Sequence, residues 1–187
     1  GVSTILALIS ALLMHRLFYL SGRRPRWISF LYQLNLPIPH SVGAIAVLLL
    51  FSQSGLFARL SYAFHWVSSP GDFPALVFDN LGIGIIIEYV WKTTVFTGVI
   101  LLAALESAGD DYIAAARSLG ANSRQSFRYV TLPLLRPALV SASILVFAFT
   151  FGGYEVPYLL GQRTISLLPV MAYREYARVD LTARPQG

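Results

Sequence analysis

Long apolar stretches alternate with polar segments along the chain. Four stretches carry few or no charged side chains: residues 1–14, 37–55, 81–105 and 137–154. A helix needs about 20 mainly apolar residues to cross the hydrocarbon core of a bilayer. The pattern therefore predicts four membrane-spanning helices. The first is short, as a helix without its first turns would be.

Two prolines determine where the second span begins. No Asp, Glu, Lys or Arg occurs from Trp27 to Ala58, a run that is longer than one span. Pro37 and Pro39 interrupt this run, and proline is tolerated in the first turn of a helix. We therefore expect the helix to begin near Pro37 and to end near Gly55.

Two other segments have the composition of loops. Residues 55–80 mix aromatic side chains with serine, proline and glycine, which indicates an external loop with aromatic residues at the membrane interface. Residues 155–187 carry charges, prolines and tyrosines, and we expect a loop or a re-entrant stretch there. The chain opens without Met inside an apolar run and stops in a polar one, so we expect a fragment truncated at both ends.

The composition supports a membrane protein. Of 187 residues, 56% are hydrophobic and 12% are charged, whereas a soluble domain carries about 25% charged residues. A disordered chain would be polar. Because cysteine is absent, the chain has no disulfide framework, thiolate zinc site or thiol nucleophile. We predict an all-α polytopic helix bundle, with residues 1–187 forming a single transmembrane domain.

The arginines indicate an orientation in the membrane. The chain has a formal net charge of +5. It lacks, however, the basic runs interleaved with aromatic residues that are typical of a surface that binds nucleic acid. If residues 15–26 and 106–136 are cytoplasmic, eight arginines lie inside and five lie outside. An excess of arginine on cytoplasmic loops is the usual arrangement. With four spans, both ends of the chain would then lie outside.

The sequence lacks the motifs of the common hydrolases and ATPases. The only lysine, Lys92, follows Trp91, so no Walker motif with its Gly-Lys pair exists. The three histidines are far apart, and neither a Gly-x-Ser-x-Gly nor a His-Glu-x-x-His motif occurs. We therefore predict neither an enzyme nor a metal or cofactor site.

Three charged residues are candidates for a solute pathway. Glu88 and Lys92 lie four residues apart in the third span, so they share a helix face and can pair. Ionisable groups at such depth usually face a cavity or the protein interior. The alternative is a self-neutralised pair that orients the helix near the outer interface. Glu155, after the fourth span, is either a contact for solute or the delivering protein, or an ordinary interfacial acid.

The polar segment 106–136 predicts a bent pair of amphipathic helices. Asp110 or Asp111 can cap the first helix, and Gly120 is a natural stop. Asn122 or Ser123 can cap the second helix. There Phe127 and Val130 share one face, Arg124 and Arg128 share another, and Pro133 closes the helix. Such a unit on the cytoplasmic side is either a docking surface or a stiff connector.

The residues of this segment resemble a known motif. Ala115, Ala116, Gly120, Val130, Leu132 and Pro133 have the spacing of the "EAA" loop found in permease subunits of bacterial binding-protein-dependent ABC importers. The resemblance extends to the segments 36–40, 91–96 and 154–161. One position departs from the pattern: Ala114 stands where the family has a glutamate that helps to hold the loop against the ATPase. Asp111, one turn earlier, is a candidate substitute.

The resemblance implies a non-enzymatic, pore-forming subunit of an ATP-driven importer in the bacterial inner membrane. Two such subunits form the pathway, two ATPase subunits dock on their loops, and an extracytoplasmic binding protein delivers a small solute. The family core has five or six spans. The docking residues would be Asp111, Ala114, Ala115, Ala116, Gly120, Phe127, Val130, Leu132 and Pro133.

Two other classes remain open at this point. A secondary transporter or channel would have no ATPase partner and no reason to keep the bent loop at this spacing. A membrane-bound enzyme would need a nucleophile–base pair or a metal set, and no segment offers one. Among solutes, the segment after the fourth span is more similar to permeases for polyamines, sulfate, ferric iron or thiamine than to those for sugars.

Overall fold

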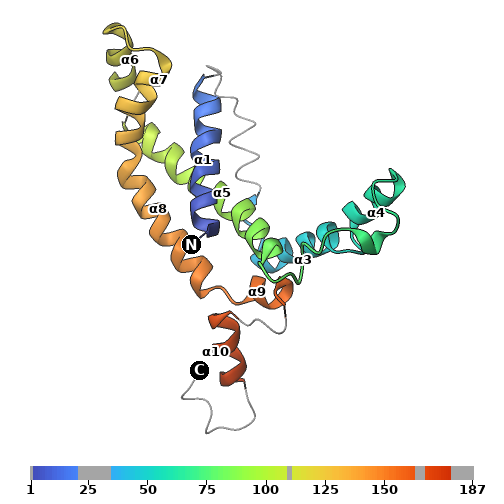
Figure 1. Ribbon diagram of the computed structural model, residues 1–187. Helices are drawn as coiled ribbons and strands as arrows, with labels where there is room; N and C mark the ends of the chain where they lie inside the picture. Colours follow the sequence, from blue (N-terminus) through green and yellow to red (C-terminus); the bar gives the residue numbers. More distant parts are fainter. Residues whose placement is uncertain (1, 21–34, 109–110, 163–166, 178–187) are drawn as a thin grey trace. The chain divides into compact units, whose positions relative to one another are not determined.

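All regular structure in the described part of the chain is helical, which confirms the predicted all-α class (Figure 1). The computed structural model describes residues 2–20, 35–108, 111–162 and 167–177. The principal helices and short helical segments are α1 (Val2–Leu20), α3 (His40–Phe51), α4 (Leu56–Ala63), η1 (Pro70–Asp72), α5 (Ile83–Ala108), α6 (Asp111–Ser118), α7 (Ser123–Ser126), η2 (Phe127–Thr131), α8 (Leu132–Gly152), α9 (Glu155–Leu160) and α10 (Leu168–Tyr176).

Three helical stretches among these residues are long and apolar enough to cross a membrane. They are His40–Ala63, Ile83–Ser107 and Ser123–Gly152, and Val2–Leu13 is a shorter apolar helix. The four apolar stretches of the sequence are thus helical, and the first is again the shortest. A polytopic helix bundle accounts for this pattern.

The second span begins later than expected, at His40 rather than near Pro37. Pro39 precedes the helix in an extended conformation, with φ −62° and ψ 151°. The ring of a proline disfavours the helical region for the residue before it, here Ile38. The helix therefore cannot include Pro37 and Ile38, and Pro39 becomes its N-cap.

The segments predicted as loops contain short helices. Within residues 55–80, α4 exposes Leu56, Phe57 and Leu60. After the fourth span, where the sequence predicted a loop or a re-entrant stretch, the chain forms the short helices α9 and α10. Pro157 of α9 and Pro169 of α10 each stand within the first turn of their helix, where proline is tolerated.

The chain forms two compact units. The first comprises residues 1–37 and 90–148 and therefore contains α1, most of α5, the loop helices and most of α8. Its core holds Ala11, Leu101 and Leu135, all buried. Small residues such as Ala11 allow membrane helices to approach closely.

The second unit comprises residues 38–89 and 149–187. Here α3 packs against α9, and the first turns of α5 join them through a buried cluster of apolar side chains. The members of this cluster are Ala44, Val47, Val77, Ile85, Tyr89, Val156 and Leu160. The cluster holds the beginning of α5 beside the short helix that follows α8.

Two adjacent glycines at the end of α8 provide a matched test of this packing. A Cβ at Gly153 would lie 2.8 Å from the Tyr89 hydroxyl and 2.9 Å from the Phe149 carbonyl oxygen, whereas one at Gly152 would meet no atom within 4 Å. Overpacking of this kind costs about 1–3 kcal/mol. We expect Gly153→Ala to lower the thermal unfolding temperature of the detergent-solubilised protein and Gly152→Ala to leave it nearly unchanged. Equal effects would contradict the described packing.

Candidate functional site: a bent loop and a buried polar junction

The segment predicted to carry the function is a bent pair of helices. Helix α6 ends at Ser118, and Gly120 follows with φ +83°. This left-handed conformation is costly for residues with a β-carbon. No atom lies within 4 Å of a Cβ built at Gly120, so the backbone conformation, and not crowding, explains the glycine.

A capping box fixes the start of α7. The Asn122 side chain accepts from the Gln125 backbone N–H at 2.9 Å, and the Gln125 side chain accepts from the Asn122 N–H at the same distance. Of the two caps that the sequence left open, Asn122 is therefore the one used. The buried Ile113 anchors α6, which contacts both α7 and η2.

The second helix does not end at Pro133, contrary to the sequence-based expectation. A π-helical turn, η2, leads directly into α8, and the Leu132 N–H bonds to the Phe127 carbonyl five residues back. A proline cannot donate to the carbonyl four residues before it, and its ring crowds that carbonyl. The wider π turn changes the hydrogen-bond register just before Pro133, so the helix continues. Pro137 likewise lies inside α8, although the fourth span was expected to begin there.

The predicted docking residues divide into an exposed and a half-buried set. Asp111, Ala114, Ala115 and Gly120 are exposed. The half-buried set consists of Ala116, Phe127, Val130, Leu132 and Pro133. The shared face of Phe127 and Val130 thus turns partly inward and supports the exposed part of the loop.

Three exposed side chains of the loop were missed by the sequence analysis. Tyr112, Tyr129 and Leu119 are 60%, 71% and 88% exposed. The sequence offered one signal, the apolar Leu119 directly before the glycine that ends the helix. This position alone does not tell whether the side chain points outward or inward.

Glu88 is buried completely, and its partner comes from another helix. Its Oε1 lies 3.0 Å from Nδ1 of His40, whose side chain is 36% exposed. The second carboxyl oxygen, Oε2, has no hydrogen-bond partner among the described residues. Next to it, the Tyr89 hydroxyl donates to the Gly153 carbonyl at 3.4 Å. We call Glu88, His40, Tyr89 and Gly153 the polar junction.

The expected pair of Glu88 and Lys92 is not formed. Lys92 Nζ donates to the backbone carbonyls of Asn35 and Leu36 at 2.5 and 3.2 Å, while Glu88 bonds to His40. A shared helix face makes a pair geometrically available. In the folded chain, Lys92 instead binds the two carbonyls just before Pro37, and Glu88 binds His40 of α3.

Glu155 is exposed and is the first residue of α9. A carboxylate in the first turn of a helix interacts favourably with the helix dipole. Close to it, the ring of Tyr154 stacks on Tyr173 with centroids 4.5 Å apart. The helix dipole alone therefore accounts for a carboxylate at this position.

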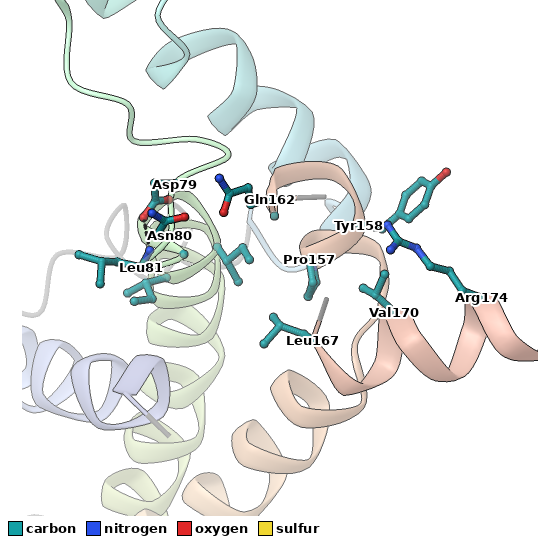
Figure 2. A pocket seen from close by; sticks show the side chains of 13 residues that line it. Asp79, Asn80, Leu81, Pro157, Tyr158, Gln162, Leu167, Val170 and Arg174 are labelled. Carbon is teal, nitrogen blue, oxygen red and sulfur yellow. Dashed lines mark hydrogen bonds between the residues drawn. The ribbon is translucent and has the colours of Figure 1, made fainter. Parts of the chain in front are cut away.

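A cavity of about 240 Å³ lies in the second unit, near the start of α5, α9 and α10. Figure 2 shows Asp79, Asn80 and Gln162 on one side of it and Tyr158 and Arg174 on another. Asp79 accepts from the backbone N–H groups of Leu81 and Ile83. Its carboxylate therefore serves to cap α5. No group of three or more His, Asp or Glu residues suited to a metal exists in the described ranges.

Comparison with known proteins identifies the family. Residues 3–179 match the family model described as "Binding-protein-dependent transport system inner membrane component". The chain belongs to this family. The family consists of transport permease subunits, which are not themselves enzymes, and the apolar helices agree with a membrane protein.

Several curated permeases are similar to this chain. The inner membrane ABC transporter permease protein YdcU of Escherichia coli K12 is 32% identical over 79% of this chain and 46% of its own length. The thiamine transport system permease ThiP of Brucella abortus 2308 is 30% identical over 85% and 28%. The molybdenum transport system permease ModB of Mycobacterium tuberculosis H37Rv is 32% identical over 71% and 47%. This permease chain spans less than half the length of each of these relatives.

The polar junction generates a prediction for the permease. His40→Leu leaves the buried Glu88 without a partner, which costs about 1–3 kcal/mol, whereas Glu88→Leu leaves only the half-exposed His40. We expect the double variant to be more stable than His40→Leu alone, since replacing both partners removes the unsatisfied group. Thermal unfolding of the three variants and the parent measures this coupling. Strictly additive losses would show that the two side chains do not interact.

Proposed function

We propose that this chain is the membrane domain of a pore-forming permease subunit in an ATP-driven importer, and that residues 106–136 dock on its ATPase. The observation that carries the proposal is the exposed, bent two-helix unit around Gly120. Family membership and the names of the curated relatives support the importer class.

The construction of the loop suits a docking element. The glycine at φ +83° turns the chain between α6 and α7, and the Asn122–Gln125 capping box sets the direction of the second helix. Helix α7 then continues through η2 into α8 without a break. A force on the loop is therefore passed to a candidate membrane span through continuous helix.

The proposed partners follow from the transport class. They are ATP-binding cassette ATPase subunits on the cytoplasmic side, a second permease subunit that completes the pathway, and an extracytoplasmic binding protein. The inner membrane is the proposed location, and α1, α5 and α8 are proposed to traverse it together with the α3–α4 segment.

The geometry favours a structural role for the charged residues of the third span. Glu88 is completely buried against His40, and Lys92 holds backbone carbonyls at Asn35 and Leu36. We propose that both orient neighbouring segments around the pathway. Glu155, which is exposed at the start of α9, is the one of the three that a solute or binding protein could touch directly.

The relatives transport chemically different solutes according to their names, which include thiamine, molybdenum and trehalose/maltose. These names do not single out one solute for this permease. The thiamine relative agrees with the expected preference, but a sugar-type relative matches as well. The alternative of a secondary transporter is disfavoured by family membership.

The left-handed turn at Gly120 provides a test of docking. A β-branched residue is strained in this conformation, at a cost of about 1–2 kcal/mol, while asparagine tolerates it. We expect Gly120→Val in the full-length permease to reduce recovery of the co-purified ATPase and to reduce solute uptake. Gly120→Asn is the matched control and should retain both. Membrane levels should be equal for all three proteins.

Ala115→Asp tests the same surface without changing the backbone. Ala115 is exposed on α6, so the aspartate is harmless in the isolated subunit but places a buried, unpaired charge in a docked interface. We expect reduced ATPase recovery with unchanged thermal stability. If Ala115→Asp and Gly120→Val both leave recovery and uptake intact, the loop is only a connector.

The absence of cysteine allows the orientation to be measured directly. Single cysteines at the exposed positions Ser123 and Ser68 should differ in their reaction with a membrane-impermeant maleimide in spheroplasts with intact inner membranes. We expect Ser68→Cys to be labelled from outside and Ser123→Cys only after permeabilisation. External labelling of Ser123→Cys would reverse the proposed topology.

A further inference from the structure

We propose that the ATPase surface that receives this loop is acidic around an apolar socket, so that this permease is held by arginines and one leucine instead of by the family's glutamate. The inference rests on the proposed function and adds the chemistry of the partner surface. It follows from the charges, exposure and fixed geometry of residues 111–136.

The first observation is the charge of the loop. The loop 106–136 contains three carboxylates, Glu106, Asp110 and Asp111, and four arginines, Arg117, Arg124, Arg128 and Arg136. The carboxylates all precede the arginines, so residues 112–136 carry only positive charge. All four arginines are exposed. Among the described residues, the guanidinium groups of Arg124, Arg128 and Arg136 have no hydrogen-bond or ion-pair partner. Within this part of the chain, three exposed cationic groups can therefore face a partner.

The second observation concerns Ala114. The loop pattern that this chain resembles has a glutamate at this position, whereas here an exposed methyl group occupies it. Asp111 lies on the same face of α6 one turn earlier, at the N-terminal end where the helix dipole already attracts its charge. A partner site that accepts a glutamate would face the methyl group here and, one turn further on, Arg117. Electrostatic complementarity therefore favours carboxylates on the partner.

The third observation is the apolar contact offered beside these charges. Leu119 is 88% exposed at the turn directly before Gly120, and Tyr112 is 60% exposed near the other end of α6. Exposed leucine and tyrosine side chains provide the anchor that an interface core needs, while charges around them steer the encounter. Figure 1 shows α6 and α7 together at the start of α8.

Anionic lipid is the competing source of carboxylate or phosphate charge. Membrane attraction depends on the number of basic and apolar groups and does not require them in a fixed arrangement. Here the positive φ of Gly120 and the capping box hold Arg124 at a defined place relative to Leu119. Such precision favours a protein surface with a matching shape.

The test measures binding of the ATP-binding subunit encoded beside the permease gene. The full-length permease is placed in nanodiscs of phosphatidylcholine alone, so that no anionic lipid is present. At 0.05 M NaCl we expect Arg124→Glu/Arg128→Glu to weaken binding at least about tenfold, because like charges would then face each other. Arg124→Lys/Arg128→Lys should retain binding. Raising NaCl to 0.5 M should weaken wild-type binding, since salt screens such pairs.

Matched controls separate local from general effects. Arg59→Glu reverses one charge on α4, outside the loop, and should leave binding unchanged. Leu119→Ala should weaken binding, whereas Leu168→Ala, which removes another exposed leucine (64% against 88%) from α10, should not. Unfolding temperatures of the Arg124, Arg128 and Leu119 variants should match the parent.

Each result has a distinct meaning. Wild-type binding that is insensitive to salt and to both charge-reversing substitutions overturns the acidic-surface inference and leaves the docking function intact. Failure of the wild-type permease to bind the ATPase in either salt overturns the docking function as well. If Arg124→Glu/Arg128→Glu changes binding only in discs that contain phosphatidylglycerol, the arginines serve lipid contact and the inference is wrong.

Discussion

Polar groups inside a membrane must find their partners within the protein, and the arrangement of α5 depends on this constraint. Two turns of the helix carry Glu88, Tyr89 and Lys92. Glu88 bonds to His40, the Tyr89 hydroxyl reaches the Gly153 carbonyl, and Lys92 satisfies carbonyls before α3. These contacts tie a single helix to chain segments about 50 to 65 residues away.

The shape of the loop between α5 and α8, in contrast, is set by interactions between residues close together in the chain. A glycine in the left-handed conformation ends one helix, and a reciprocal cap begins the next. Its inward face is supported by Ile113, while Leu119 faces outward. Local interactions thus build a rigid, exposed surface, and the continuous helix from Ser123 to Gly152 connects that surface to a candidate span.

The accuracy of the sequence-based predictions reflects this division. The break at Gly120 and the cap at Asn122 could be predicted because each depends on residues within a few positions. The same local reasoning also allowed Glu88 and Lys92 to pair, but in the structure Glu88 bonds to His40 instead. The true partner, His40, is 48 residues away, and helix periodicity contains no information about another helix. Pro133 was misjudged because a π turn, which has no simple sequence signal, precedes it.

The sequence by itself determined the class of the protein, because apolar stretches of span length and a scarcity of charge admit few solutions other than membrane helices. It also determined the bent loop, whose spacing agrees with the family that residues 3–179 match. Only the tertiary structure decided which polar groups meet in the membrane-crossing helices, which helices follow the last span, and which loop side chains face outward. Those outcomes depend on packing between segments distant in the chain, where several partners satisfy the same local pattern and burial selects one of them.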